Sequence, residues 1–138
     1  MKIKPIVIDR FLITHLSFVI DFQFTNNITI LAGISGTGRT LCFTAIKESL
    51  DPNIICINYL FYQKDIAALI RKETGKLIVI DNADIRKYIS LDDKNQYLII
   101  GRNPKNLFAT IDNLFELKSE KEGEQTIFRL VSFYNFEK

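Results

Sequence analysis

Short apolar runs that alternate with helical patterns constrain the fold of this chain more than any other feature. A short continuous apolar run is typical of a strand buried on both faces, as strands in parallel sheets are. The runs are Ile28–Ala32, Ile54–Ile57, Leu77–Ile80 and Tyr97–Ile100. Helical spacing is found in Thr40–Leu50, Asp65–Thr74 and Ala83–Ile89. Strands alternating with helices favour an α/β fold, with a mainly parallel sheet and flanking helices.

The two ends of the chain show antiparallel patterns instead. Between positions 16 and 24 apolar and polar residues alternate, which predicts a strand with one buried face. That face comprises Leu16, Phe18, Ile20, Phe22 and Phe24. Near the C-terminus, Asn113–Lys118 and Thr126–Phe136 flank a polar turn, Ser119–Glu124. We therefore expect an antiparallel N-terminal strand and a C-terminal hairpin at the edges of the sheet, with the final strand a candidate exposed edge for pairing.

The size and composition of the chain predict one soluble domain spanning residues 1–138. The 138 residues are 47% hydrophobic and 25% charged, which is the balance of a globular protein. No stretch approaches the ~20 apolar residues of a membrane span. The N-terminus, Met1-Lys2-Ile3-Lys4-Pro5, leads into no secretory signal, so we expect a cytoplasmic protein without membrane contact.

Charge and the scarce reactive residues exclude several classes of function. Eighteen Lys and Arg against sixteen Asp and Glu give a net charge of +2, spread evenly, so binding to nucleic acid is not supported. Cys42 and Cys56 lie apart from other zinc-binding residues and are interpreted as reduced core residues. His15, the single histidine, lies in a strand-like stretch and has no nearby nucleophile, which argues against triad chemistry.

The loop after the first buried run carries the strongest chemical pattern. It reads Gly33-Ile34-Ser35-Gly36-Thr37-Gly38-Arg39-Thr40 and matches the phosphate-binding pattern G-x-x-x-x-G-K-[ST], with Arg39 in the lysine position. Glycines let a tight loop aim backbone N–H groups at an anion, and the following helix adds its positive N-terminal end. The predicted nucleotide-binding residues are Gly33, Ser35, Gly36, Thr37, Gly38, Arg39 and Thr40.

Polar residues after two later strands complete the predicted site. Asp81 ends the apolar strand Leu77–Ile80, and with the hydroxyl of Thr40 it would bind Mg²⁺. Arg102 and Asn103 follow the strand Tyr97–Ile100, where a side chain is able to sense a terminal phosphate. An ordinary turn at the end of a strand is an equally good interpretation of these two residues.

At these residues the chain resembles the P-loop NTPases. The resemblance covers roughly residues 28–103 and is carried by Gly33, Gly38, Thr40 and Asp81. The lead-in strand and loop are similar to ABC-type and SMC-type ATPase domains, whereas Asp81-Asn82-Ala83-Asp84 is similar to the Asp-Glu-Ala-Asp of AAA-type proteins. No LSGGQ-like signature and no room for a helical lid are found, so the resemblance implies a minimal core.

The sequence departs from a working NTPase at Arg39 and Asn82. Arginine keeps the positive charge, but its planar fork does not fit a site shaped for the compact ammonium of lysine. Asn82 stands where a catalytic glutamate often follows the Mg²⁺-binding acid, and an amide cannot accept a proton from water. No catalytic residue is therefore assigned, and we expect hydrolysis slowed by orders of magnitude.

These observations predict a degenerate P-loop regulatory protein that binds ATP or GTP with Mg²⁺ and hydrolyses it slowly or not at all. We expect a protein partner to respond to the bound nucleotide. Aromatic residues within 59–62 and 133–136 provide side chains that interfaces favour. Two alternatives stay open. One is an interaction or inhibitor protein that uses the P-loop scaffold without nucleotide, and the other is an active small ATPase in which Arg39 replaces lysine.

Overall fold

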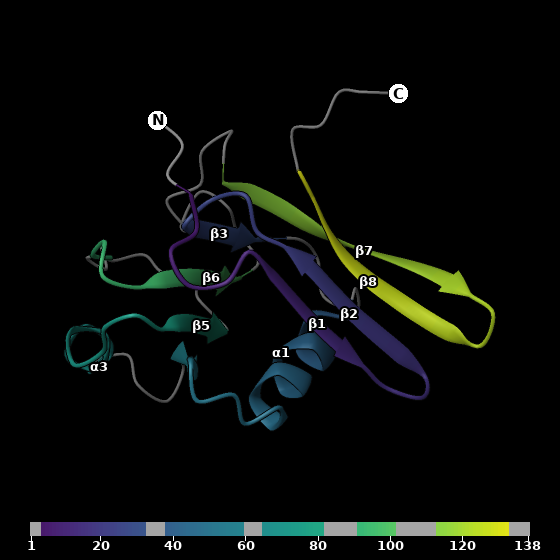
Figure 1. Ribbon diagram of the computed structural model, residues 1–138, viewed down its shortest axis with the longest axis horizontal. Helices are drawn as coiled ribbons and strands as arrows, with labels where there is room; N and C mark the ends of the chain where they lie inside the picture. Colours follow the sequence, from purple (N-terminus) through teal and green to yellow (C-terminus); the bar gives the residue numbers. More distant parts are fainter. Residues whose placement is uncertain (1–3, 33–37, 60–64, 82–90, 102–112, 133–138) are drawn as a thin grey trace.

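The computed structural model describes residues 4–32, 38–59, 65–81, 91–101 and 113–132 (Figure 1). Within these ranges the chain forms an eight-stranded sheet with the strand order β1-β2-β8-β7-β3-β6-β5-β4. The strands are β1 (Arg10–Thr14), β2 (Phe18–Gln23), β3 (Ile28–Leu31), β4 (Ile54–Asn58), β5 (Leu77–Asp81), β6 (Gln96–Ile100), β7 (Leu114–Glu122) and β8 (Gln125–Ser132). The helices are α1 (Arg39–Glu48) and α3 (Ile66–Arg71).

The predicted α/β class is confirmed, with a mixed and mostly parallel sheet. Strands β3, β6, β5 and β4 pair in parallel, and β7 adds a further parallel partner on the other side of β3. The apolar runs are these strands, and both described helices lie where helical spacing predicts them. The helix predicted at Ala83–Ile89 falls outside the described residues. Among the described helices, none has the length and apolar character needed to cross a membrane.

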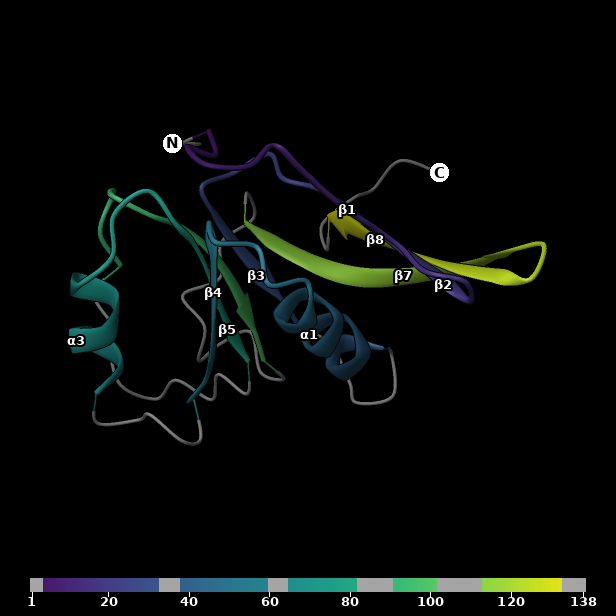
Figure 2. The ribbon, with the colours of Figure 1, turned by 60° about the horizontal axis from the view of Figure 1, so that its bottom comes forward.

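The two helices pack against opposite faces of the parallel strands (Figure 2). Because neighbouring residues of a strand point to opposite faces, each strand contributes to two separate cores. Ile78, Ile80 and Ile99 join the core that contains α3. Val79 and Ile100 join the core that contains α1. This burial on both faces explains why the runs are apolar without alternation.

The strands β1, β2, β8 and β7 form a ribbon that curls over α1 (Figures 1 and 2). β1 pairs with β2 and β7 with β8 in antiparallel fashion, whereas β2 and β8 are parallel. Phe11, Phe22 and Phe128 of this ribbon share the core with Cys42 and Phe43 of α1. The helix is therefore enclosed between the ribbon on one side and the parallel strands on the other.

The N-terminal prediction is right for β2 but wrong for Leu16. Ile20 and Phe22 are fully buried and Phe24 is 5% exposed, as the alternation predicts. Leu16 is 92% exposed because it lies, with His15, in the turn that joins β1 to β2. The backbone N–H of His15 donates to the carbonyl of Phe18 across this turn, at 2.8 Å. The strand is therefore shorter than the alternation predicts, and the alternation does not indicate the separate strand β1.

The C-terminal hairpin is present, but its last strand is not an exposed edge. β8 lies between β7 and β2, so the strands at the two ends of the described sheet are β1 and β4. The hairpin is also tighter than expected, because Glu122 pairs with Gln125 and only Gly123 and Glu124 form the turn. Gly123 has a φ of 64°, a left-handed conformation that such short turns require.

Buried amides fasten the N-terminal segment to the amino ends of the parallel strands. The side-chain carbonyl of Gln96 accepts from the backbone N–H groups of Val7 and Ile8 at 3.1 and 2.8 Å, and its amide donates to the carbonyl of Ile8 at 3.0 Å. Asn27 accepts from Ile6 N–H and donates to the carbonyl of Asn95. These bonds satisfy polar groups that burial would otherwise penalise. They lie at the edge of the sheet opposite to the carboxyl edge, where the predicted site lies.

Candidate functional site

The predicted site lies at the carboxyl ends of β3, β6 and β5, and the structure describes part of it. Gly38, Arg39, Thr40 and Asp81 are described. The residues Gly33, Ser35, Gly36, Thr37, Asn82, Arg102 and Asn103 fall outside the described residues. β3 ends at Leu31 and α1 begins at Arg39, so the predicted loop stands between a buried strand and a helix. This is the setting in which the loop pattern binds phosphate.

Two independent observations explain why glycine occupies position 38, directly before α1. Its φ is 100°, in the left-handed region that L residues rarely adopt. A Cβ built on Gly38 would lie 2.6 Å from Cε1 of Phe128, closer than any real Cβ contact. The N–H of Cys42 donates to the carbonyl of Gly38 at 3.0 Å, which closes the first helical turn. Glycine is thus required by the backbone and by the ribbon strand β8.

Arg39 turns inward from the start of α1 toward the end of β6. The residue is 9% exposed, and its Nη1 donates to the backbone carbonyl of Gly101 at 2.6 Å. The N–H of Gly101 in turn donates to the carbonyl of Leu31 at 3.1 Å. The guanidinium therefore links the first residue of the helix to the carboxyl end of the strand that neighbours β3.

Asp81 and Thr40 are placed at the same edge, on the side of the sheet that α1 covers. Leu77 and Val79 belong to the α1-side core, and Asp81 follows with the same parity along β5. Its side chain is partly buried, whereas Thr40 is exposed in the first turn of α1. The edge thus combines a hydroxyl, a carboxylate and the positive end of a helix, the groups that a Mg²⁺–phosphate pair requires.

The charges of Lys47 and Asp81 both act on the thiol of Cys56. Burial raises the pKa of Cys56 to about 11; the positive charge of Lys47 opposes this rise and the negative charge of Asp81 adds to it. Cys56 pairs in register with Val79, two positions before Asp81.

Clusters of metal-ligating side chains are not found among the described residues. No group of three or more His, Cys, Asp or Glu side chains there is able to hold a metal ion. A P-loop magnesium site differs from such clusters, because it combines one hydroxyl and one carboxylate with phosphate oxygens and water. Thr40 and Asp81 fit that donor set.

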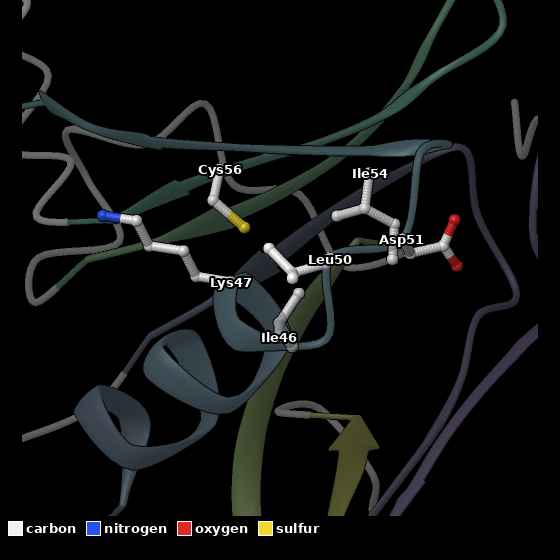
Figure 3. Close-up of a pocket in the computed structure, with 6 residues that line it drawn as sticks. All are labelled: Ile46, Lys47, Leu50, Asp51, Ile54 and Cys56. Atoms are coloured by element: carbon white, nitrogen blue, oxygen red, sulfur yellow. The ribbon is translucent and has the colours of Figure 1, made fainter.

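A groove missed by the sequence analysis lies at the far end of α1, against β4 (Figure 3). Its volume is about 290 Å³, and it is lined by Ile46, Lys47, Leu50, Asp51, Ile54 and Cys56. Figure 3 shows Leu50 and the thiol of Cys56 facing each other, while the ammonium of Lys47 and the carboxylate of Asp51 point away. The groove has both apolar and charged lining residues and lies at the opposite end of the helix from Arg39. It is separate from the predicted phosphate site.

Comparison of this chain with protein-family models, with curated proteins and with solved structures finds no match in any of the three.

Proposed function

We propose that this chain is a degenerate P-loop nucleotide-binding regulatory protein, which binds ATP or GTP with Mg²⁺ and hydrolyses it slowly or not at all. The observation that carries the proposal is the junction of β3 and α1. There the loop pattern stands between a buried strand and a helix whose first residue, Arg39, reaches the carboxyl end of β6. Asp81 ends β5 at the same edge of the sheet.

The order of the strands supports a ligand site at this edge. From β3 the chain crosses through α1 to β4 at the end of the sheet, and after β6 it continues to β7 on the other side of β3. The connection that leaves β3 and the connection that leaves β6 therefore run toward opposite ends of the sheet. In open α/β sheets ligands bind outside the carboxyl ends of the strands at such a point. The predicted loop follows β3, which is one of the two strands that flank this point.

The chemistry of the site supports binding more than turnover. Lysine normally bridges the β- and γ-phosphates, and arginine in its place has a different shape and reach. The sequence has Asn82 after Asp81, and an amide does not act as a general base. Each of these groups contributes several kcal/mol to transition-state stabilisation in P-loop enzymes, or a factor of ~10² or more in rate.

Calorimetric titration with ATP and with GTP, with and without Mg²⁺, tests the proposal. We expect micromolar binding, about −8 kcal/mol, that depends on Mg²⁺. Asp81→Asn should remove the Mg²⁺ dependence, and Lys47→Ala, at the far end of α1, serves as the control that leaves binding unchanged. The absence of binding at millimolar nucleotide would refute the proposal. A steady-state turnover near 1 s⁻¹ would show an active small ATPase instead.

A second candidate is an interaction or inhibitor protein that uses this scaffold without nucleotide. The bond from Arg39 to Gly101 favours it, because a buried guanidinium that ties α1 to β6 also serves a purely structural purpose. In that case neither nucleotide binds, and the partner protein is recognised through another surface. Both candidates require a protein partner. Of the aromatic residues predicted for an interface, Tyr59 is described, and it packs against the α3-side core.

A further inference from the structure

Strand β1 ends the described sheet, and one of its two borders has no partner strand (Figure 1). The N–H of His15, directly after β1, donates to the carbonyl of Phe18 at 2.8 Å, so the backbone groups of His15 face β2. Alternate residues of an antiparallel strand turn these groups to opposite borders. The backbone N–H and C=O groups that point away from β2 are those of Arg10, Leu12 and Thr14, and no described residue bonds to them.

The side chains of the same three residues are exposed, which leaves this border of β1 open. Leu12 is 52% exposed although it is apolar. Natural proteins usually protect such a border with lysine, proline or a bulge. β1 contains neither residue, and its five residues pair one-to-one with β2. Its single charged side chain, Arg10, donates from Nε and Nη2 to the carboxylate of Asp21 at 2.8 and 3.0 Å.

The strand at the other end of the described sheet, β4, is less open. The N–H of Ile54 already donates to the carbonyl of Asp51 at 3.1 Å. Each residue of β4 is partly or fully buried. Of the two ends of the described sheet, β1 is therefore the one at which a further strand is able to add.

The sequence of β1 is complementary to itself when two copies run antiparallel about Leu12. In that register Leu12 lies opposite Leu12 of the second copy and Arg10 lies opposite Thr14, so every outward N–H and C=O group finds a partner. On the α1-side face Phe11 lies opposite Ile13, and these two apolar side chains already belong to one core in each copy. The two copies of Arg10 are about 14 Å apart, beyond the ~8–10 Å over which exposed charges act.

We propose that β1 is a docking surface for a second copy of this chain, which pairs β1 with β1 in antiparallel fashion and joins the two sheets into one. Five residues of each copy take part, against the roughly 20–30 residues a side of a standard interface. The dimer is therefore reversible and forms at high protein concentration. Three strands separate β1 from β3 in the sheet, so this association is independent of the proposed nucleotide site.

Sedimentation equilibrium of the full chain, from about 10 µM to about 1 mM, tests the association. We expect the average mass to rise from that of one chain toward that of two, with a dissociation constant on the order of 0.1 mM. A wild-type chain that is still monomeric at about 1 mM would overturn the proposal.

Leu12→Lys and Leu16→Lys are the matched variants for this experiment. Leu12→Lys places two ammonium groups directly opposite each other, so the dissociation constant should rise about tenfold or more. Leu16 is 92% exposed but lies in the turn after β1, outside the paired residues, so Leu16→Lys should leave the constant unchanged. Equal losses in the two variants would show general apolar association and refute pairing through β1.

Cysteine crosslinking tests the register about Leu12. Opposite Cα atoms in a hydrogen-bonded pair are ~5.5 Å apart, so a short bismaleimide should join two Leu12→Cys chains. The two copies of residue 14 are about 14 Å apart, so Thr14→Cys chains should not be joined above background. Both positions are exposed, and the wild-type chain with its native Cys42 and Cys56 gives the background. Equal crosslinking at positions 12 and 14, or none at position 12, would refute the proposed pairing.

Discussion

Replacing Gly38 with alanine tests whether the last glycine of the loop is held by both its backbone and the ring of Phe128. The φ of 100° places Gly38 in a region where an L residue costs about 1–2 kcal/mol. The added Cβ would lie 2.6 Å from Cε1 of Phe128, and that ring is buried against α1. Overpacking of this kind costs about 1–3 kcal/mol. We therefore expect Gly38→Ala to lower the free energy of unfolding by about 3 kcal/mol.

The chain contains its own control for the backbone contribution. Gly123 also has a positive φ, of 64°, but a Cβ there meets nothing within 4 Å. Gly123→Ala should therefore cost only about 1 kcal/mol. Urea denaturation followed by circular dichroism measures both variants against the wild-type chain. Equal losses in the two variants would show that the ring of Phe128 contributes nothing at Gly38.

A double-mutant cycle separates the clash from the strain. Phe128→Leu removes the ring edge that the new Cβ meets, so Gly38→Ala should cost only about 1–2 kcal/mol in that background. The coupling between the two positions is then about 1–2 kcal/mol. A cycle that closes with no coupling would refute the packing argument even if Gly38→Ala alone were destabilising.

Other groups give predictions that separate experiments check. The thiol of Cys56 is partly exposed, but burial raises its pKa to about 11. Alkylation of Cys56 at pH 8 should therefore be on the order of a hundredfold slower than alkylation of a free thiol, and its rate should rise about tenfold per pH unit. A rate equal to that of a free thiol at pH 8 would contradict this. Burial raises the pKa of Cys42 to about 12, so protonation of this thiol favours the folded state below pH 9. The free energy of unfolding should therefore fall between pH 9 and 12. In a Cys42→Ala variant the free energy of unfolding should fall less over the same pH range. The hydrogen bond from Arg10 holds the pKa of Asp21 below its usual value, so this pair stabilises the fold above about pH 4 and loses its effect as the pH falls through the folded pKa. Asp21→Asn should therefore destabilise the chain slightly at pH 7 in urea denaturation, and this loss should shrink as the pH falls below about 4; the effect is small because the side chain of Arg10 is 53% exposed. Gln96→Leu removes the partners of two backbone N–H groups and should cost about 2–3 kcal/mol, with faster hydrogen exchange at Val7 and Ile8; unchanged exchange there would refute the anchoring role.

The parallel half of the fold was predictable from sequence because its strands are buried on both faces. Ile78 and Val79 are both fully buried although they point in opposite directions, so the run is continuously apolar. A continuous run bounded by helical spacing has few other interpretations. The order of the strands was not predictable, since nothing in the local pattern of Tyr97–Ile100 states that β6 inserts between β3 and β5.

The antiparallel half was harder because only one of its faces is strongly buried and its turns are short. Leu16 continues the alternation of β2 but lies in the turn, so periodicity alone gave the wrong boundary. For the site, the loop pattern and Asp81 were found from spacing. The ring of Phe128 lies where a Cβ on Gly38 would be, and Arg39 bonds to Gly101; these pairs are 90 and 62 positions apart in the chain. Contacts at that separation depend on the three-dimensional packing.

The two cores that flank the sheet differ in their aromatic content. The α3-side core is built mainly from isoleucine, and the described tyrosines, Tyr59 and Tyr97, both pack in it. The α1-side core contains phenylalanines instead, among them Phe11, Phe22 and Phe128. The chain has no tryptophan. Tyrosine fluorescence of the described residues therefore reports on one layer, and the near-ultraviolet dichroism of phenylalanine on the other. Among the residues that the structure describes, the loosening of the ribbon around α1 and the melting of the isoleucine layer therefore change the surroundings of different kinds of aromatic side chain.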